Sequence, residues 1–109
     1  MKFGLFFEHQ VQRPWAEGDE HRVLTEAREQ AEAADRLGFD HLWVVEHHFL
    51  EEYSHSSAPE VFLGACAART KQIRLGHGIV LMPPRYNHPA RVAERIATLD
   101  LLSGGRVEF

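Results

Sequence analysis

The sequence has little cysteine, no long apolar run and no excess of basic residues. Its one cysteine, Cys66, cannot form a disulfide within the chain, which fits a reducing compartment. No apolar run approaches the roughly 20 residues that a membrane-spanning helix needs. The N-terminus lacks the basic segment and apolar stretch that mark a secretory signal. We therefore expect a cytoplasmic protein with no membrane-spanning segment.

The charge balance argues against two classes of partner. The chain has 12 basic and 16 acidic residues, for a net charge of −4. Binding to nucleic acid or to an anionic membrane needs a basic face, so neither partner is expected. With 44% apolar and 26% charged residues in 109, the composition is that of one small globular domain.

Apolar periodicity and helix-stop signals divide the chain into alternating strands and helices. Apolar residues recur at helical spacing from Val23 to Leu37, and Gly38 follows as a stop. The segment "HLWVV" is apolar at consecutive positions, which is typical of a strand covered on both faces. Ser57 and Glu60 stand at the spacing of a capping box and predict a helix start. The patterns predict strands over residues 2–7, 41–45, 73–81 and 106–109, and helices over residues 58–69, 89–103 and 19–37.

This alternation predicts an α/β fold with a parallel sheet and right-handed crossovers. A closed parallel barrel needs about 250 residues and eight strand–helix units. We expect residues 1–109 to be the N-terminal portion, roughly the first half (β-α-β-α-β-α-β), of a TIM-type (β/α)8 barrel, and the chain to be truncated. A half-barrel that closes against a second copy is the alternative.

In such folds, ligands bind at the carboxyl ends of the strands. The first predicted strand runs into Glu8 and His9, and the second into the segment "EHHF" at residues 46–49. Within it, His47 is the first candidate for proton transfer, because imidazole titrates near neutral pH. The alternative is that both adjacent histidines are ordinary loop residues. Trp15 is the aromatic residue best placed to line a pocket from the first loop, and the alternative is an incidental surface contact.

Two other kinds of site fit the sequence less well. The chain has 8 histidines, but "EHH" lacks the i, i+4 spacing of a helical zinc site, so we expect no metal. Gly104 and Gly105 follow a helix rather than precede one, which is the wrong order for a phosphate loop.

Cys66 stands among alanines and is expected in the core. Gly78 marks either close approach of the backbone to a ligand or a bulge.

Three segments in order carry a family resemblance: "MKFGLFF", "LGFDHLWVVEHHF" and "IRLGHGIVLMPPRYNHPARVAERIATLDLLSGGRVEF". Together they resemble the bacterial luciferase-like family of flavin-dependent monooxygenases, over essentially the whole chain. The resemblance implies an oxidoreductase that binds reduced FMN at the barrel rim and uses molecular oxygen on a small organic substrate. It also implies a flavin reductase that supplies reduced FMN, and a homo- or heterodimer.

The resemblance assigns roles by position in these motifs. It makes His47 the catalytic residue and implies a cis peptide bond between His77 and Gly78 against the flavin. Glu108 stands where a family member has an arginine near the flavin phosphate, and the phosphate loops of such barrels follow later strands. Residues 1–109 alone are therefore not expected to hold FMN tightly or to be active. The implied cofactor contacts are Phe6, Glu46, His77 and Gly78, and the implied substrate-pocket residues are His48 and Phe49.

Three alternatives stay open beside this function. The same fold could use a deazaflavin for hydride transfer. It could also be a non-catalytic barrel subunit, against which the retained His47 argues. The third alternative, from a different class, is a metal-dependent hydrolase.

Overall fold

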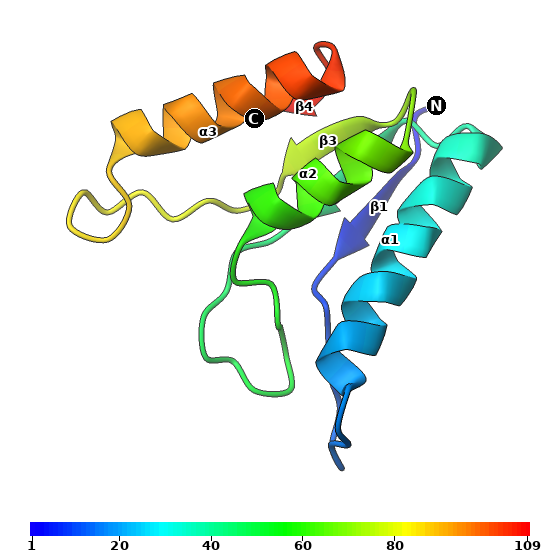
Figure 1. The fold of residues 1–109 in the computed structure, drawn as a ribbon, viewed down its shortest axis with the longest axis vertical. Coiled ribbons are helices and arrows are strands. Elements are labelled where there is room, and N and C mark those ends of the chain that lie inside the picture. Colours follow the sequence, from blue (N-terminus) through cyan, green and yellow to red (C-terminus); the bar gives the residue numbers. More distant parts are fainter.

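The computed structural model describes residues 1–109, in which four strands alternate with three helices (Figure 1). The order confirms the expected α/β alternation. The elements are β1 (Gly4–Phe7), α1 (Asp19–Leu37), β2 (His41–Val44), α2 (Pro59–Arg69), β3 (Arg74–His77), α3 (Pro89–Ser103) and β4 (Val107–Glu108).

The strands form one parallel sheet in the order β1-β2-β3-β4. The register places Phe6 beside Trp43, Trp43 beside Gly76, and Gly76 beside Glu108. Sequence order and spatial order are therefore the same, as in the wall of a parallel barrel.

β3 ends at His77, four residues earlier than the sequence predicts. Gly78 still donates its backbone N–H to the carbonyl of Val44, at 2.8 Å. The backbone N–H of Leu81 instead donates to the Glu46 carboxylate, at 2.8 Å. A side chain thus replaces the neighbouring strand as the acceptor, and residues 79–82 leave the sheet.

The helices pack on one side of the sheet, in front of the strands in Figure 1. Because side chains alternate along a strand, Leu42, Val44 and Leu75 face the helices, whereas Trp43 and Gly76 face the other side. We call this other side the inner face. The buried core between sheet and helices consists of Ala31, Ala34, Leu42, Val44, Leu63, Cys66, Ile73, Leu75 and Leu99.

Cys66 is a core residue, as expected. It is fully buried on α2, and burial raises the pKa of its thiol to about 12. The thiol is therefore un-ionised at neutral pH and is a poor nucleophile.

The predicted capping box at the start of α2 is wrong. The N-cap is Ala58, with no side-chain cap, and Glu60 instead lies 3.3 Å from Nε of Arg95 on α3. The glycine stops are confirmed, because Gly38 and Gly104 cap α1 and α3 in the left-handed conformation. None of the helices is both long and apolar enough to cross a membrane.

Candidate functional site

The ends of β1 and β2 are joined by the returning loop at residues 54–56. Ser54 Oγ donates to the carbonyl of Glu8 at 2.6 Å, and Ser56 Oγ donates to the carbonyl of Val45 at 2.7 Å. The backbone N–H of His47 donates to the carbonyl of Ser56 at 2.8 Å. These bonds fix the backbone on both sides of "EHH", and they place Glu8 of the first strand end opposite His47 of the second.

Glu8, His47 and Tyr53 form a group that we call the His47 cluster. Nε2 of His47 lies 3.7 Å from Oε2 of Glu8, beyond hydrogen-bond distance. The ring of Tyr53 packs edge-on against the His47 ring, with centroids 5.5 Å apart, and its hydroxyl donates to Oε1 of Glu8 at 3.4 Å. The ring nitrogens of His47 make no hydrogen bond within the chain.

Glu46, His48 and Tyr86 form a second group of the same composition, the His48 cluster. Nε2 of His48 lies 2.9 Å from Oε1 of Glu46 and 2.6 Å from the hydroxyl of Tyr86. Glu46 is buried, and its other oxygen accepts the N–H of Leu81. Partial desolvation and the negative charge of Glu46 raise the pKa of Tyr86, so its phenol stays protonated at neutral pH.

The two adjacent histidines therefore differ in what their rings can do. His48 is committed to two partners, which fixes its ring and ties the loop after β3 to the end of β2. The imidazole of His47 retains its hydrogen-bonding capacity for a ligand or a transferred proton.

A cleft of about 600 Å³ opens beside both histidines at the rim of the sheet. His47, His48 and Phe49 all line it, so the structure brings together three residues that the sequence predicts for one site. Phe49 is fully exposed and has a positive φ of 58°. Trp15 lines the same cleft, as expected, and donates its indole N–H to the carbonyl of Val11 at 3.0 Å.

Phe6 and Gly78 lie together on the inner face. Phe6 is 59% exposed, and a Cβ built on Gly78 would lie 3.2 Å from Cε2 of Phe6. Glu46, the third predicted cofactor contact, is buried, and its carboxylate contacts His48, Leu81 and Tyr86. It therefore holds the rim residues in place rather than lying open to the cleft.

The side chain of His77 does not reach the rim cleft. It is buried on the helix side of β3, in a small pocket with Val92 and Ile96 of α3, and burial lowers its pKa. The predicted cis bond between His77 and Gly78 is wrong in this structure, where the cis peptide bond is Arg13–Pro14.

Glu108 points onto the inner face rather than toward the rim cleft. Its carboxylate accepts a hydrogen bond from Arg74 and lies 3.8 Å from Nε2 of His41. In this structure it is therefore engaged with the side chains of His41 and Arg74, at the starts of β2 and β3.

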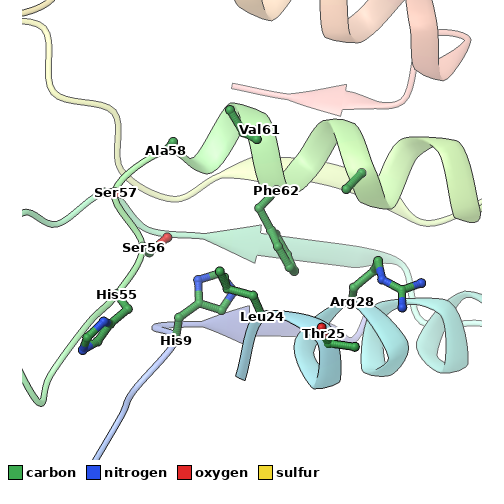
Figure 2. Close-up of a pocket in the computed structure, with 11 residues that line it drawn as sticks. His9, Leu24, Thr25, Arg28, His55, Ser56, Ser57, Ala58, Val61 and Phe62 are labelled. Carbon is green, nitrogen blue, oxygen red and sulfur yellow. The ribbon is translucent and has the colours of Figure 1, made fainter. Parts of the chain in front are cut away.

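A separate pocket of about 320 Å³ lies between α1 and α2 (Figure 2). His9 lines it, buried between the rings of Phe7 and Phe62 at centroid distances of 5.8 and 4.6 Å. His55 and Ser57 border both this pocket and the rim cleft. The two spaces are therefore neighbours on either side of one loop, and the candidate site is the cleft that contains both His47 and His48.

The partners of the two histidines were not predicted from the sequence. Glu8 was expected at the rim but not beside His47, and Tyr53 and Tyr86 had no predicted role. Tyr53 follows β2 and Tyr86 follows β3, so both lie in loops at the carboxyl ends of strands. That position was the available signal for both tyrosines.

Comparison with known proteins gives consistent matches. The family model for luciferase-like monooxygenases matches residues 1–109. The limonene 1,2-monooxygenase of Rhodococcus erythropolis is 42% identical over 109 residues, which span 98% of this chain and 26% of that protein. The oxygenase component of flavin-dependent trigonelline monooxygenase from Acinetobacter baylyi is 33% identical over 100% of this chain and 29% of its own length.

Solved structures agree with these sequence matches. The crystal structure of apo-MsnO8 superposes with a TM-score of 0.84 at 33% identity, over 99% of this chain and 31% of that one. The oxygenating constituent of 3,6-diketocamphane monooxygenase from Pseudomonas putida, a type II Baeyer–Villiger monooxygenase in complex with FMN, superposes with a TM-score of 0.79 at 27% identity. That match spans 98% of this chain and 28% of the other. The chain thus spans about a quarter to a third of the length of these relatives.

Proposed function

Since the chain belongs to the luciferase-like monooxygenase family, we propose that it forms the first part of a TIM-type barrel enzyme that uses reduced FMN and molecular oxygen to oxygenate a small organic substrate. His47 is the catalytic residue in this proposal. Residues 1–109 form the N-terminal portion of the enzyme's barrel. The substrate pocket includes His48 and Phe49, which border the same cleft as His47.

The observation that carries the proposal is the contrast between the two histidines at the end of β2. A residue that accepts and returns protons needs a ring nitrogen that is not committed to the protein. His48 fails this requirement because Glu46 and Tyr86 contact its Nε2 and the Tyr86 hydroxyl also lies 3.4 Å from its Nδ1, which leaves neither ring nitrogen free. His47 meets it, in a cleft large enough for a small molecule.

The rim and inner face fit a flavin ring by their chemistry. An isoalloxazine ring is flat, with apolar faces and a polar edge, and it packs well on exposed aromatic and backbone surfaces. Phe6 and the backbone of Gly78 offer such a surface, and His77 contributes its backbone rather than its side chain. These residues would contact the ring of the cofactor and not its phosphate.

The bound reduced flavin would supply the electrons that activate oxygen. The residues of this chain would then have three tasks. His47 moves a proton, Trp15 and Phe49 cover the cleft against bulk water, and the His48 cluster holds the loop after β3 over the rim.

A separate flavin reductase is the expected supplier of reduced FMN. The trigonelline relative is described as an oxygenase component, which indicates a second protein in that system. We extend that arrangement to this protein, together with a homo- or heterodimeric assembly.

The test uses the intact protein, reconstituted in turn with FMN and with a deazaflavin, in an oxygen-uptake assay. We expect oxygen consumption with reduced FMN and a reductase. Consumption of no oxygen, with hydride transfer to the deazaflavin instead, would favour the alternative cofactor.

The role of His47 is tested in the same assay. His47→Ala should lower turnover by about 10²- to 10⁴-fold, the usual contribution of general acid–base catalysis. His21→Ala, on the exposed face of α1, is the matched control and should leave turnover unchanged. Full activity of His47→Ala would instead refute His47 as the proton carrier.

A further inference from the structure

We infer that Glu8 is the positioning residue of His47: its carboxylate accepts the Nε2–H of the neutral imidazole and so fixes the ring and its tautomer. This inference rests on the proposed function, because only a reacting His47 gives its tautomer a chemical consequence. With Nε2 protonated, Nδ1 is left as the basic nitrogen.

Glu8 has unmet hydrogen-bonding capacity. Its Oε2 atom is buried and has no hydrogen-bond partner in the chain. An unpaired buried carboxylate oxygen is costly, so such an atom is expected to find a donor. The donor beside it is the imidazole of His47, whose Nε2 lies 3.7 Å away.

The other carboxylate oxygen of Glu8 already has a partner. The hydroxyl of Tyr53 donates to Oε1 at 3.4 Å, while the Tyr53 ring packs against the His47 imidazole. Tyr53 therefore holds the carboxylate from one side and the imidazole from another. Oε2 is left for His47.

The backbones of Glu8 and His47 are held by the same loop, residues 54–56. The carbonyl of Glu8 accepts from Ser54, and the N–H of His47 donates to Ser56. These bonds fix the backbone at Glu8 and at His47. A small rotation of either side chain is therefore enough to bring Nε2 of His47 within hydrogen-bond distance of Oε2 of Glu8. Glu46 and His48 show the closed form of the same contact, at 2.9 Å.

The other charged groups around the cleft are already paired. Glu20 lies 2.6 Å from Nδ1 of His55, and Glu51 forms an ion pair with Arg13. Their charges are thus partly neutralised by partners of their own. Glu8 is the carboxylate left to act on His47.

The test reads the tautomer directly. The intact protein is labelled with ¹⁵N-histidine, and two-bond proton–nitrogen correlations are recorded at a pH where histidine is neutral. Loss of one signal set in His47→Gln assigns the residue. The wild type should show the Nε2–H tautomer of His47, and an Nδ1–H tautomer would overturn the inference.

Variants at Glu8 extend the test. Glu8→Leu removes the acceptor and should release His47 to the tautomer mixture of a free imidazole, with a smaller Nε2–H share than in the wild type. Glu8→Gln keeps an amide oxygen that can accept and should preserve the tautomer. Glu52→Leu is the matched control, because Glu52 is exposed and pairs with Arg13; it should change nothing. An unchanged tautomer in Glu8→Leu would overturn the inference.

Turnover separates this inference from the proposed function. Glu8→Leu should lower kcat about 10- to 100-fold, as for loss of a residue that orients a functional group, with the KM for flavin changed less than about twofold. Glu8→Gln should recover most of that loss. If His47→Ala abolishes turnover but Glu8→Leu changes neither kcat nor the tautomer, the role of Glu8 is refuted and the proposed function stands. If His47→Ala keeps full turnover, the proposed function fails whatever the tautomer is.

Discussion

The indole ring of Trp43 lies directly over Gly76 on the inner face of the sheet. A Cβ built on Gly76 would lie 2.2 Å from Cε3 of Trp43, far inside van der Waals contact. Trp43 and Gly76 are partners in the β2–β3 register, so the ring crosses to the neighbouring strand. Gly76 is therefore required by packing against an aromatic ring, and not by a left-handed backbone.

Gly76→Ala should destabilise the protein by about 1–3 kcal/mol, the usual cost of overpacking a fitted interior. Gly64→Ala is the matched control, because a Cβ on this helical glycine of α2 would have nothing within 4 Å. That control should stabilise by about 0.5–1 kcal/mol through helix propensity. Urea unfolding of the intact variants measures both, and equal stability of the Gly76 variant and the wild type would contradict the packing argument.

Helix ends were predictable wherever a glycine follows the helix. The ranges 19–37 and 89–103 agree with the structure, because Gly38 and Gly104 take the left-handed conformation that ends a helix. The end of β3 was not predictable from local apolar residues. Residues 79–81 are apolar like a strand, but the N–H of Leu81 is captured by the carboxylate of Glu46, 35 positions away.

The residues that meet at the rim followed from topology, but their partners did not. Ends of neighbouring parallel strands must lie together, which is why "EHHF" and Glu8 are adjacent. Which histidine is free depends on tyrosines supplied by loops, and loop paths are not encoded in periodicity. His77 could have been predicted better, because two residues after the core residue Leu75 a side chain faces the helices again.

Asp35 anchors the turn before β3 and should be sensitive to removal. Its carboxylate accepts the backbone N–H groups of Lys71, Gln72 and Ile73, at 2.9, 2.8 and 2.7 Å. Asp35→Ala leaves these donors without an acceptor and should destabilise by about 3 kcal/mol. Glu29→Ala, at an exposed position of the same helix, is the control. A loss of less than about 1 kcal/mol in urea unfolding would show that water replaces the carboxylate.

Asp35 also predicts acid sensitivity. Burial alone would raise its pKa, but the hydrogen bonds from Ile73, Lys71 and Gln72 outweigh burial and lower it. The stabilisation is therefore complete above the unfolded-state pKa of about 4 and is lost as the pH falls through the lower folded-state value. The difference in unfolding free energy between wild type and Asp35→Ala should shrink below pH 4.

His9 predicts pH dependence in a higher range. Burial lowers its pKa from 6.5 to about 4, so between these values the unfolded chain binds a proton that the folded chain excludes. Wild-type stability should fall from pH 6.5 toward pH 4, by about 1.4 kcal/mol per pH unit at most. His9→Phe keeps a ring between Phe7 and Phe62 and should remove this contribution.

Urea unfolding at pH 7.5, 6 and 5 measures how the unfolding free energy of the wild type and of His9→Phe changes with pH. Exposed His21→Gln should keep the wild-type slope, and equal slopes for His9→Phe and wild type would contradict burial of a neutral imidazole.

Tyr86 separates a supporting role for His48 from a reactive one. Its hydroxyl lies 2.6 Å from Nε2 of His48 and 3.4 Å from Glu46, and it belongs to the loop that borders the rim after β3. Tyr86→Phe removes these bonds but leaves the contact between His48 and Glu46 in place. If the tyrosine only holds the loop over the cleft, the KM for the organic substrate should rise roughly fivefold, the effect of one ordinary hydrogen bond, with kcat changed less than about twofold. Steady-state kinetics of the intact, FMN-reconstituted protein measures both constants, and Tyr53→Phe provides the same chemical change in the His47 cluster. A large loss of kcat at unchanged KM in Tyr86→Phe would mean that His48 and Tyr86 take part in the proton transfer, and His47 would then no longer be the sole proton carrier at this rim.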